Sequence, residues 1–332
     1  MTQKATIYDI SKLANVSIAT VSRVVNNDSS VKDKTREKVI EVMNKLRYRP
    51  SQSARLMGEK RDTVSVGVLY RYASSGFFTE LLKGIDQALS QKNCLMMASR
   101  LKEEPSTIDE VQEYIKRSGA QALIMLYPEW SKAFIDYLKS SSVPIVVIGE
   151  PHEEDIGYQV NSDSKKSLET LVKKLVKKSR RDTVIVHGPN TNREAQERLE
   201  TTLKVLNALE ISSEEISLIN GEFQPEVSKE KLGLWLESHT KNKPFNLICH
   251  NDSMALASMA LLMEKGYSIP RDVAVMGHDD IEFAETFNLS TIRVNFEKLG
   301  EIAAGKALRL LKYEEVERRT IVQSEAILRS SI

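Results

Sequence analysis

The sequence predicts a small all-α N-terminal domain followed by a larger α/β domain with parallel sheets. Apolar residues recur at helical spacing in three short segments within the first 46 residues. From residue 63 onward, short apolar or β-branched runs alternate with longer helical segments, which is typical of βαβ units and a parallel sheet. At 332 residues the chain is too long for one compact core and suits two or three domains.

Residues 5–27 predict two short helices joined by a tight turn. Thr6 is a candidate N-cap for the first helix, with Asp9 three residues later in capping-box position. Ser17 is the candidate cap of the second helix, whose predicted inward stripe is Val21, Val24 and Val25. The opposite face of that helix is small, polar and basic: Ile18, Ala19, Ser22, Arg23 and Asn26. The pattern is typical of a helix-turn-helix, in which the second helix lies in the major groove of DNA. An ordinary helical hairpin is the alternative.

A third helix is expected over residues 32–46, and Tyr48-Arg49-Pro50 ends it. Its predicted inward residues are Val39, Ile40, Val42, Met43 and Leu46. Residues 1–60 contain 12 Lys/Arg and 6 Asp/Glu, a net charge of +6, whereas the remainder carries −5. A basic head on an acidic body is expected when only the head meets phosphate.

The segment TIYDISKLANVSIATVSRVVN closely resembles the N-terminus of the lactose-repressor (LacI/GalR) family of bacterial transcription regulators. Residues 31–39 and 46–50 extend this resemblance, which continues with gaps to the C-terminus. It implies an N-terminal all-α helix-turn-helix domain plus an α/β two-lobed periplasmic-binding-protein-like effector domain with parallel sheets. It also implies a repressor that binds double-stranded DNA at a pseudo-palindromic operator. Some family members end in a leucine heptad tail that makes tetramers, and the absence of such a tail after Ile332 favours a homodimer.

The recognition helix of such a protein reads DNA through its exposed face. Arg23 is the best candidate for a bidentate contact to guanine. The residues expected to read base edges are Ile18, Ala19, Ser22, Arg23 and Asn26. Those expected to hold phosphates are Thr6, Tyr8, Ser17 and Thr20, with Ser22 as a further candidate.

Residues 51–58 form a short helix-prone segment between the head and the α/β domain, and a plain linker is the alternative. In the family this segment becomes a hinge helix on DNA, and a leucine seven residues after the proline wedges into the minor groove. Counting from Pro50 places Met57 at that position, with Leu56 just before it, so either side chain is a candidate wedge. The expected minor-groove hinge is Ala54, Arg55, Leu56 and Met57, and Ala54 would let paired hinge helices approach closely.

The α/β domain divides into two similar halves. Strands are expected at 63–69, 95–99, 122–126 and 144–148, and again at 183–186, 216–219, 247–249 and 273–277, with a helix at 77–92. The expected domains are 1–49 for the helix-turn-helix, 50–62 for the hinge and linker, and 63–332 for effector binding and dimerisation. The resemblance implies one lobe of about 63–160 and 293–320 and a second of about 161–290 and 321–332, with crossings near 161 and 290.

Ligands of open α/β sheets bind at the carboxyl ends of strands, and polar residues follow several of the expected strands. Arg198, Asn251 and Asp279 match family positions that hydrogen-bond effector hydroxyls. Phe223 and Phe296 match positions that place an aromatic ring against a sugar. Each has a structural alternative: Asp279 as a helix cap, Arg198 as part of a cross-cleft ion pair, and both phenylalanines as core residues.

Arg71 and Arg193 add to Arg198 two further arginines near the expected cleft. The family positions lead us to expect a sugar or sugar derivative as the effector. Because guanidinium groups recognise carboxylate and phosphate, a sugar acid or sugar phosphate is the specific hypothesis. Surface arginines are the alternative. The resemblance also leaves open a purine or a protein corepressor as the effector.

Other classes of protein fit the sequence poorly. Adjacent Asp279 and Asp280 would point apart rather than converge on one bond, and no histidine pair has metal-ligand spacing, so we expect no enzyme activity, metal or cofactor. No phosphate-loop motif occurs, and Cys94 and Cys249 indicate neither a disulfide framework nor a zinc cluster. The sequence shows no export signal, which a transport binding protein would need, and no membrane-spanning run, so we expect a cytoplasmic protein associated with the nucleoid.

Overall fold

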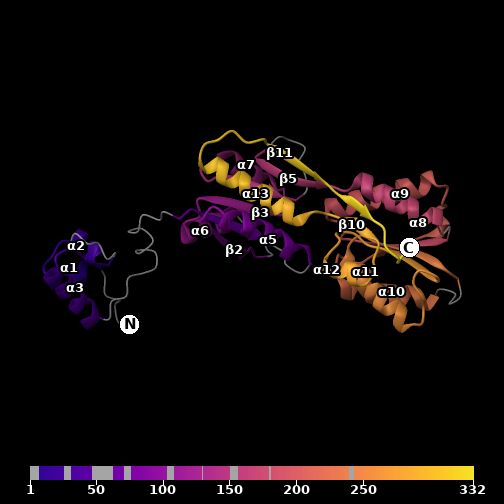
Figure 1. Ribbon diagram of the computed structural model, residues 1–332, viewed down its shortest axis with the longest axis horizontal. Helices are drawn as coiled ribbons and strands as arrows, with labels where there is room; N and C mark the ends of the chain where they lie inside the picture. The colour runs from indigo at the N-terminus through magenta and orange to yellow at the C-terminus, as the bar shows by residue number, and fades with distance from the viewer. Residues whose placement is uncertain are drawn as a thin grey trace.

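The computed structural model contains a three-helix head and two α/β lobes (Figure 1). It describes residues 7–25, 31–46, 63–70, 76–102, 108–128, 130–149, 156–178, 181–238 and 243–332. Among the predicted site residues, those outside the described ranges are Thr6, Asn26, Ala54, Arg55, Leu56, Met57 and Arg71. The backbones of Tyr8, Ser22 and Val25 are described, but their side chains are not.

The head consists of α1 (Ile7–Ala14), α2 (Ile18–Val25) and α3 (Asp33–Lys45). Its core is formed by the fully or nearly buried Ile10, Ala14, Val21, Val24 and Val39, with Val16, Val31, Val42, Met43 and Leu46 packed around them. The prediction that Ile40 faces inward is wrong, since its side chain is 45% exposed. Ile40 lies one helical step beyond the buried stripe of α3, which Val39, Val42, Met43 and Leu46 already fill.

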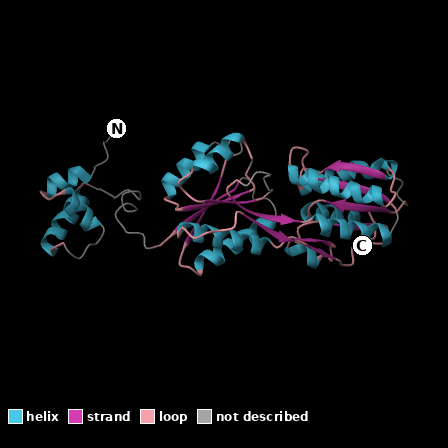
Figure 2. Ribbon diagram, turned by 90° about the horizontal axis from the view of Figure 1, so that it is seen from above, coloured by secondary structure: helices cyan, strands magenta, loops and turns pink. Residues whose placement is uncertain are grey.

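The first lobe is built on a six-stranded parallel sheet in the order β11-β5-β4-β3-β1-β2. The strands are β1 (Ser65–Tyr70), β2 (Leu95–Arg100), β3 (Ala122–Leu126), β4 (Ile145–Ile148), β5 (Tyr158–Asp163) and β11 (Arg319–Gln323). Helices α5 (Phe77–Ser90) and α13 (Phe296–Leu311) cover one face, and α6 (Ile108–Ser118) and α7 (Lys132–Ser140) cover the other (Figure 2). The central strands are buried on both faces, which explains why they are continuous apolar runs.

The second lobe repeats this plan with a four-stranded parallel sheet in the order β7-β6-β8-β9. Its strands are β6 (Asp182–His187), β7 (Ile216–Asn220), β8 (Phe245–Cys249) and β9 (Val273–Met276). One face packs on α8 (Lys165–Lys178) and α9 (Arg193–Ala208), the other on α10 (Pro225–Ser238) and α11 (Asp252–Glu264). Two short helices, η1 (Ser213–Glu215) and α12 (Glu282–Thr286), complete it.

The chain passes between the lobes at three places: from β5 to α8, from β10 (Thr291–Arg293) to α13, and from β11 to β12 (Glu325–Ile327). Strands β10 and β12 pair antiparallel beside the second lobe. The pairing of β5 with β11 carries the first sheet to Asp163 and Gln323, slightly beyond the expected limits of 160 and 320.

Helices α5 and α13 cross closely because two glycines lie at the crossing. A Cβ atom at Gly84 would lie 2.0 Å from the carbonyl oxygen of Glu297, and one at Gly300 would lie 2.3 Å from that of Leu81. Neither position can take a side chain without moving the facing backbone.

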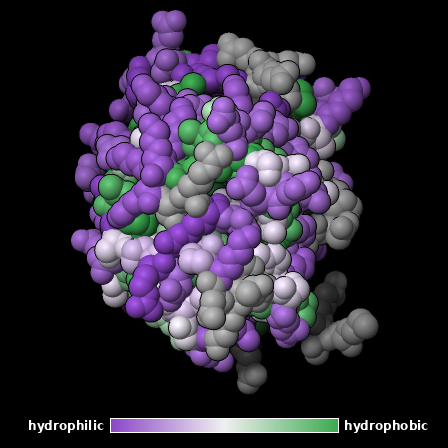
Figure 3. Space-filling view, turned by 90° about the vertical axis from the view of Figure 1, so that its right-hand side faces the viewer, coloured by the Kyte–Doolittle hydropathy of each residue, from purple (hydrophilic) through white to green (hydrophobic). Residues whose placement is uncertain are grey.

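The outer surface at the end of the second lobe is mostly hydrophilic, with scattered apolar side chains (Figure 3). No helix among the described residues is long and apolar enough to cross a bilayer.

Candidate DNA-reading helix and effector cleft

The turn between α1 and α2 is fixed by short-range hydrogen bonds. Asn15 adopts a φ of 48°, and the backbone N–H of Val16 donates to the carbonyl oxygen of Ser11 at 3.1 Å. The Ser17 hydroxyl accepts from the backbone N–H of Thr20 at 3.1 Å, which confirms Ser17 as the cap of α2. The second helix therefore leaves the turn at a defined angle.

The outer face of α2 is open to solvent. Ile18 is 39% exposed, and Ala19 and Arg23 are exposed as well, while Val21 and Val24 point into the head. Ser17 is exposed and Thr20 half-buried at the N-terminal end of the same helix. The arrangement presents an apolar, a small and a cationic side chain together, as contact with base edges requires.

In the second lobe, Arg198 is the centre of a buried polar cluster. Its guanidinium donates to the Glu194 carboxylate and to the carbonyl oxygen of His250. Nη1 lies 3.7 Å from Oδ1 of Asp279, and the guanidinium carbon lies 5.7 Å from the ring centroid of Phe223. The structure thus brings together three of the predicted effector residues. Both carboxylate partners belong to the second lobe, so Arg198 forms no cross-cleft ion pair among the described residues.

Asp279 is buried and lies between Arg198 and His278, whose Nδ1 is 3.0 Å from Oδ1. Burial raises the pKa of Asp279 to about 7, and the charge of Arg198 opposes this rise. Burial also holds the pKa of His250 and of His278 well below the ordinary value, with Arg198 acting in the same direction. Asp279 does not cap the following helix, because α12 begins at Glu282 and its flanking Ile281 N–H donates to Asp252 at 3.0 Å.

Asn251 and Phe296 have structural partners. Asn251 caps α11, since its Oδ1 accepts from Met254 N at 2.8 Å, and its Nδ2 donates to the Phe223 carbonyl at 3.2 Å. Phe296 is 3% exposed in the core of the first lobe and stacks on Phe77 at 4.8 Å between centroids. Phe77 in turn meets Tyr127 edge-on at 5.6 Å, so Phe296 supports a residue of the cleft instead of lining the cavity.

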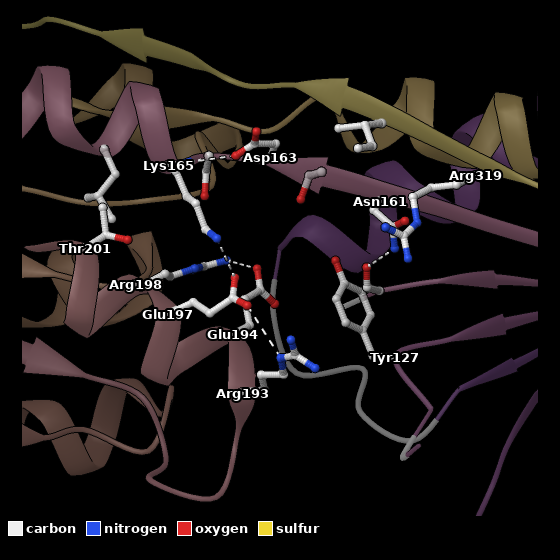
Figure 4. Close-up of a pocket in the computed structure, with 15 residues that line it drawn as sticks. Tyr127, Asn161, Asp163, Lys165, Arg193, Glu194, Glu197, Arg198, Thr201 and Arg319 are labelled. Atoms are coloured by element: carbon white, nitrogen blue, oxygen red, sulfur yellow. Dashed lines mark hydrogen bonds and ion pairs between the residues drawn. The ribbon is translucent and has the colours of Figure 1, made fainter. Parts of the chain in front are cut away.

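A cavity of about 290 Å³ opens where the two lobes meet, at the carboxyl ends of β3, β4 and β5 (Figure 4). Of the predicted effector residues, Arg193 and Arg198 line it, whereas Phe223, Asn251, Asp279 and Phe296 do not. The lining residues are Tyr127, Gly149, Asn161, Ser162, Asp163, Ser164, Lys165, Leu168, Arg193, Glu194, Glu197, Arg198, Thr201, Arg319 and Ile321.

Sequence reasoning missed Tyr127, Asn161, Lys165 and Arg319. Tyr127 directly follows the predicted strand 122–126, so the rule that ligands bind at strand ends could have found it. Asn161 and Arg319 lie on β5 and β11, which the sequence did not predict, and nothing local marks them.

Charges in the cavity are nearly balanced. Four described lining residues are cationic, Lys165, Arg193, Arg198 and Arg319, and three are carboxylates, Asp163, Glu194 and Glu197. Glu197 lies 3.5 Å from Nε of Arg193 and 3.7 Å from Nζ of Lys165. Among the described residues, no group of three histidines, cysteines or carboxylates could hold a metal ion.

Comparison with known proteins identifies both parts of the chain. The sequence profile of the bacterial regulatory proteins of the lacI family matches residues 6–51, and that of the periplasmic binding protein-like domain matches residues 172–332. The chain belongs to the lacI family. It is therefore a DNA-binding transcriptional regulator and not an enzyme, with the head and the two-lobed domain that the sequence predicted.

Full-length similarity supports this assignment. The chain is 27% identical to the probable HTH-type transcriptional repressor ExuR of Bacillus subtilis, over 98% of each chain. Its fold matches that of the Lac repressor dimer bound to operator, with a TM-score of 0.71 and 23% identity over 99% of each chain. It also matches the transcriptional regulator CelR in complex with cellobiose, with a TM-score of 0.70 and 22% identity over 99% of this chain and 100% of that one.

Proposed function

We propose that this lacI-family regulator is a repressor that binds a pseudo-palindromic operator as a homodimer and is controlled by a small polyhydroxylated ligand in the cleft between its lobes. The observation that carries the proposal is the pairing of a solvent-open recognition helix with a polar cavity at the lobe boundary. The similarity to a repressor, to an operator-bound dimer and to a cellobiose-bound regulator supports it.

In this proposal residues 1–49 bind DNA. Arg23 makes a bidentate contact to guanine, and the other base-reading residues are Ile18, Ala19, Ser22 and Asn26. Thr6, Tyr8, Ser17 and Thr20 hold phosphates and fix the register of the helix in the groove. The exposure of Ile18, Ala19 and Arg23 on one face supports this assignment.

Residues 50–62 connect DNA binding to the lobes. Met57 or Leu56 enters the minor groove at the centre of the operator, beside Ala54 and Arg55, and favours a flexible pyrimidine–purine step there. Because this segment lies between the head and the first lobe, a change in the dimer of lobes changes how the two heads are spaced.

Residues 63–332 bind the ligand and form the dimer. A ligand that touches both walls of the cavity stabilises the closed arrangement of the lobes. Such coupling between two sites is typically worth about 1–3 kcal/mol. A protein that binds chromosomal DNA works in the cytoplasm at the nucleoid, and we propose that location here.

The test begins with thermal denaturation of the full chain against sugars, sugar acids, sugar phosphates and purines, because a ligand of the native state raises the Tm. Each stabilising compound is then added to the chain bound to its preferred duplex. The proposal expects at least one compound that both raises the Tm and changes the affinity for DNA. A compound that binds without changing the affinity for DNA would contradict control through the cleft. If no compound in the panel raises the Tm, a protein corepressor is favoured.

A further inference from the structure

The walls of the cavity contain two buried polar atoms that have no hydrogen-bond partner among the described residues. Asn161 is 1% exposed; its Nδ2 donates to the Gly149 carbonyl at 2.8 Å, but its Oδ1 accepts nothing. Arg198 is 8% exposed, and its Nε donates to nothing although the terminal nitrogens are bonded. Unsatisfied buried groups are costly, and both side chains belong to residues that line the cavity, although these two atoms have almost no exposed surface. An orphan acceptor and an orphan donor are together complementary to hydroxyl groups, which both donate and accept.

The cavity also has cationic side chains on both of its walls. Arg319 lies with Asn161 and Tyr127 on the first-lobe side, while Lys165 and Arg193 lie on the second-lobe side (Figure 4). The first turns of α8 and α9, long helices that begin at Lys165 and Arg193, add their positive dipole ends to the same wall.

The carboxylates in the cavity do not cancel this preference. Glu194 is bonded to Arg198, and Asp163 accepts from the backbone N–H of Lys165 at 3.1 Å. Glu197 lies 3.5 Å from Arg193 and 3.7 Å from Lys165, longer than hydrogen-bonded ion pairs, which are about 2.7–2.9 Å. A better-placed anion can therefore replace Glu197 in its contacts with Arg193 and Lys165.

We infer that the cavity binds a polyhydroxylated anion whose acidic group pairs with Arg319 of the first lobe and with Arg193 and Lys165 of the second. Its hydroxyls lie against the side chains of Asn161 and Arg198. The volume of about 290 Å³ lies at the small end of ligand sites and suits a single sugar ring. The acidic group is a carboxylate, as in a sugar acid, or a phosphate ester, as in a sugar phosphate. This inference rests on the proposed control by a small ligand.

The test compares matched pairs of ligands by calorimetric titration of the full chain without DNA. The acids are D-glucuronate, D-galacturonate and D-gluconate, the phosphates are D-glucose 6-phosphate and D-fructose 6-phosphate, and the neutral parents are D-glucose, D-galactose and D-fructose. We expect at least one acid or phosphate to bind about tenfold or more tightly than its neutral parent, because charge-assisted hydrogen bonds are lost in the parent. A hit among the acids or among the phosphates identifies the acidic group.

The deciding variant is Arg319→Gln, which should weaken the charged ligand about 10- to 100-fold and leave the neutral parent unchanged. Arg319→Lys should recover part of the lost affinity, because it restores the positive charge without the paired N–H donors of the guanidinium. Arg318→Gln is the matched control, since Arg318 lies beside Arg319 in sequence but over the Tyr158 ring at 4.7 Å and outside the cavity lining. If Arg319→Gln fails to fold, judged by its melting curve, Arg193→Gln replaces it.

Three results would overturn the inference: no acid or phosphate binds, the neutral parents bind as tightly, or Arg319→Gln weakens charged and neutral ligands equally. DNA binding is measured separately. If the chain binds DNA and responds to a neutral sugar, the proposed function stands and this inference is wrong. If the chain binds no DNA, the proposed function is wrong whatever ligand affinities are measured.

Discussion

Arg198 and Asp279 illustrate how single buried charges shape the cleft. Arg198 loses water but gains Glu194, the His250 carbonyl and the nearby Asp279. Removing one member would leave the others buried and uncompensated, which is strongly destabilising. These two residues therefore stabilise the floor behind the cavity, which Arg198 lines and Asp279 does not.

The raised pKa of Asp279 predicts a measurable effect of pH on stability. The pKa is about 7 in the folded protein and about 4 in the unfolded chain, so between those values the folded state holds a proton that the unfolded state has lost. Considered alone, this group makes the free energy of unfolding fall as the pH rises from about 4 to about 7. Above that range Asp279 is charged in the folded protein, and the full cost of its buried charge is present. Asp279→Asn removes the penalty, so its Tm minus the wild-type Tm should increase between about pH 5 and pH 8.

The control for this prediction is Asp86→Asn, at an exposed position on α5. His250 and His278 are present in every protein compared, and burial holds the pKa of both well below its ordinary value in the folded protein. A Tm difference for Asp279→Asn that stays constant with pH would contradict the buried carboxyl.

Arg23 is the residue on which base discrimination is expected to depend most. Arg23→Ala should cost about 1–3 kcal/mol at the preferred operator and relax the choice of base at one position in each half-site. Fluorescence anisotropy on the operator and on single-base variants measures both effects. Lys45→Ala, at an exposed position on α3, is the control and should leave discrimination intact. Unchanged discrimination in Arg23→Ala would remove Arg23 from the reading set.

At the scale of elements, the crossing of α5 and α13 determines how the first lobe packs. Gly300→Ala would place a methyl group 2.3 Å from the Leu81 carbonyl oxygen and 2.9 Å from the Ile85 nitrogen, both of them backbone atoms. We expect a loss of about 1–3 kcal/mol in the free energy of unfolding, measured by urea denaturation. Gly305→Ala lies on the same helix with no atom within 4 Å of the added methyl, and it should be neutral or stabilising by up to about 1 kcal/mol. Equal stability of the two variants would contradict the close crossing.

The elements that the sequence predicted are those with strong local patterns. Ser17 and the valine stripe predict α2, and each of the eight expected strands matches an observed strand. Four observed strands were not predicted: β5, β10, β11 and β12. Strand β5 is polar, with Gln159, Asn161 and Asp163, and β10 and β12 have only three residues each. Arg319 on β11 reaches the cavity only through a pairing with β5 that is distant in sequence. The floor of the cleft and Tyr127 on its first-lobe wall were therefore predictable from the sequence, whereas Asn161 and Arg319 on that wall were not.

At the scale of the whole molecule, each of the two large sheets belongs to one lobe, and the chain passes between the lobes at three places. A ligand held by Arg319 on one side and by Arg193 and Lys165 on the other would stabilise one arrangement by its differential contacts. The basic head, at +6 over residues 1–60, meets DNA, and the lobes at −5 do not compete for it. In the proposed mechanism, the arrangement of the lobes in the dimer sets the spacing of the two heads on one duplex.

The most direct test of this account is selection of bound duplexes from a random-sequence library by the full-length wild-type chain. We predict a single enriched motif with two inverted half-sites, because a dimer presents two identical heads, and a pyrimidine–purine step at its centre, where the proposed minor-groove wedge would enter. An enriched motif without inverted symmetry, or no enrichment above non-specific binding, would contradict a dimeric, sequence-specific regulator.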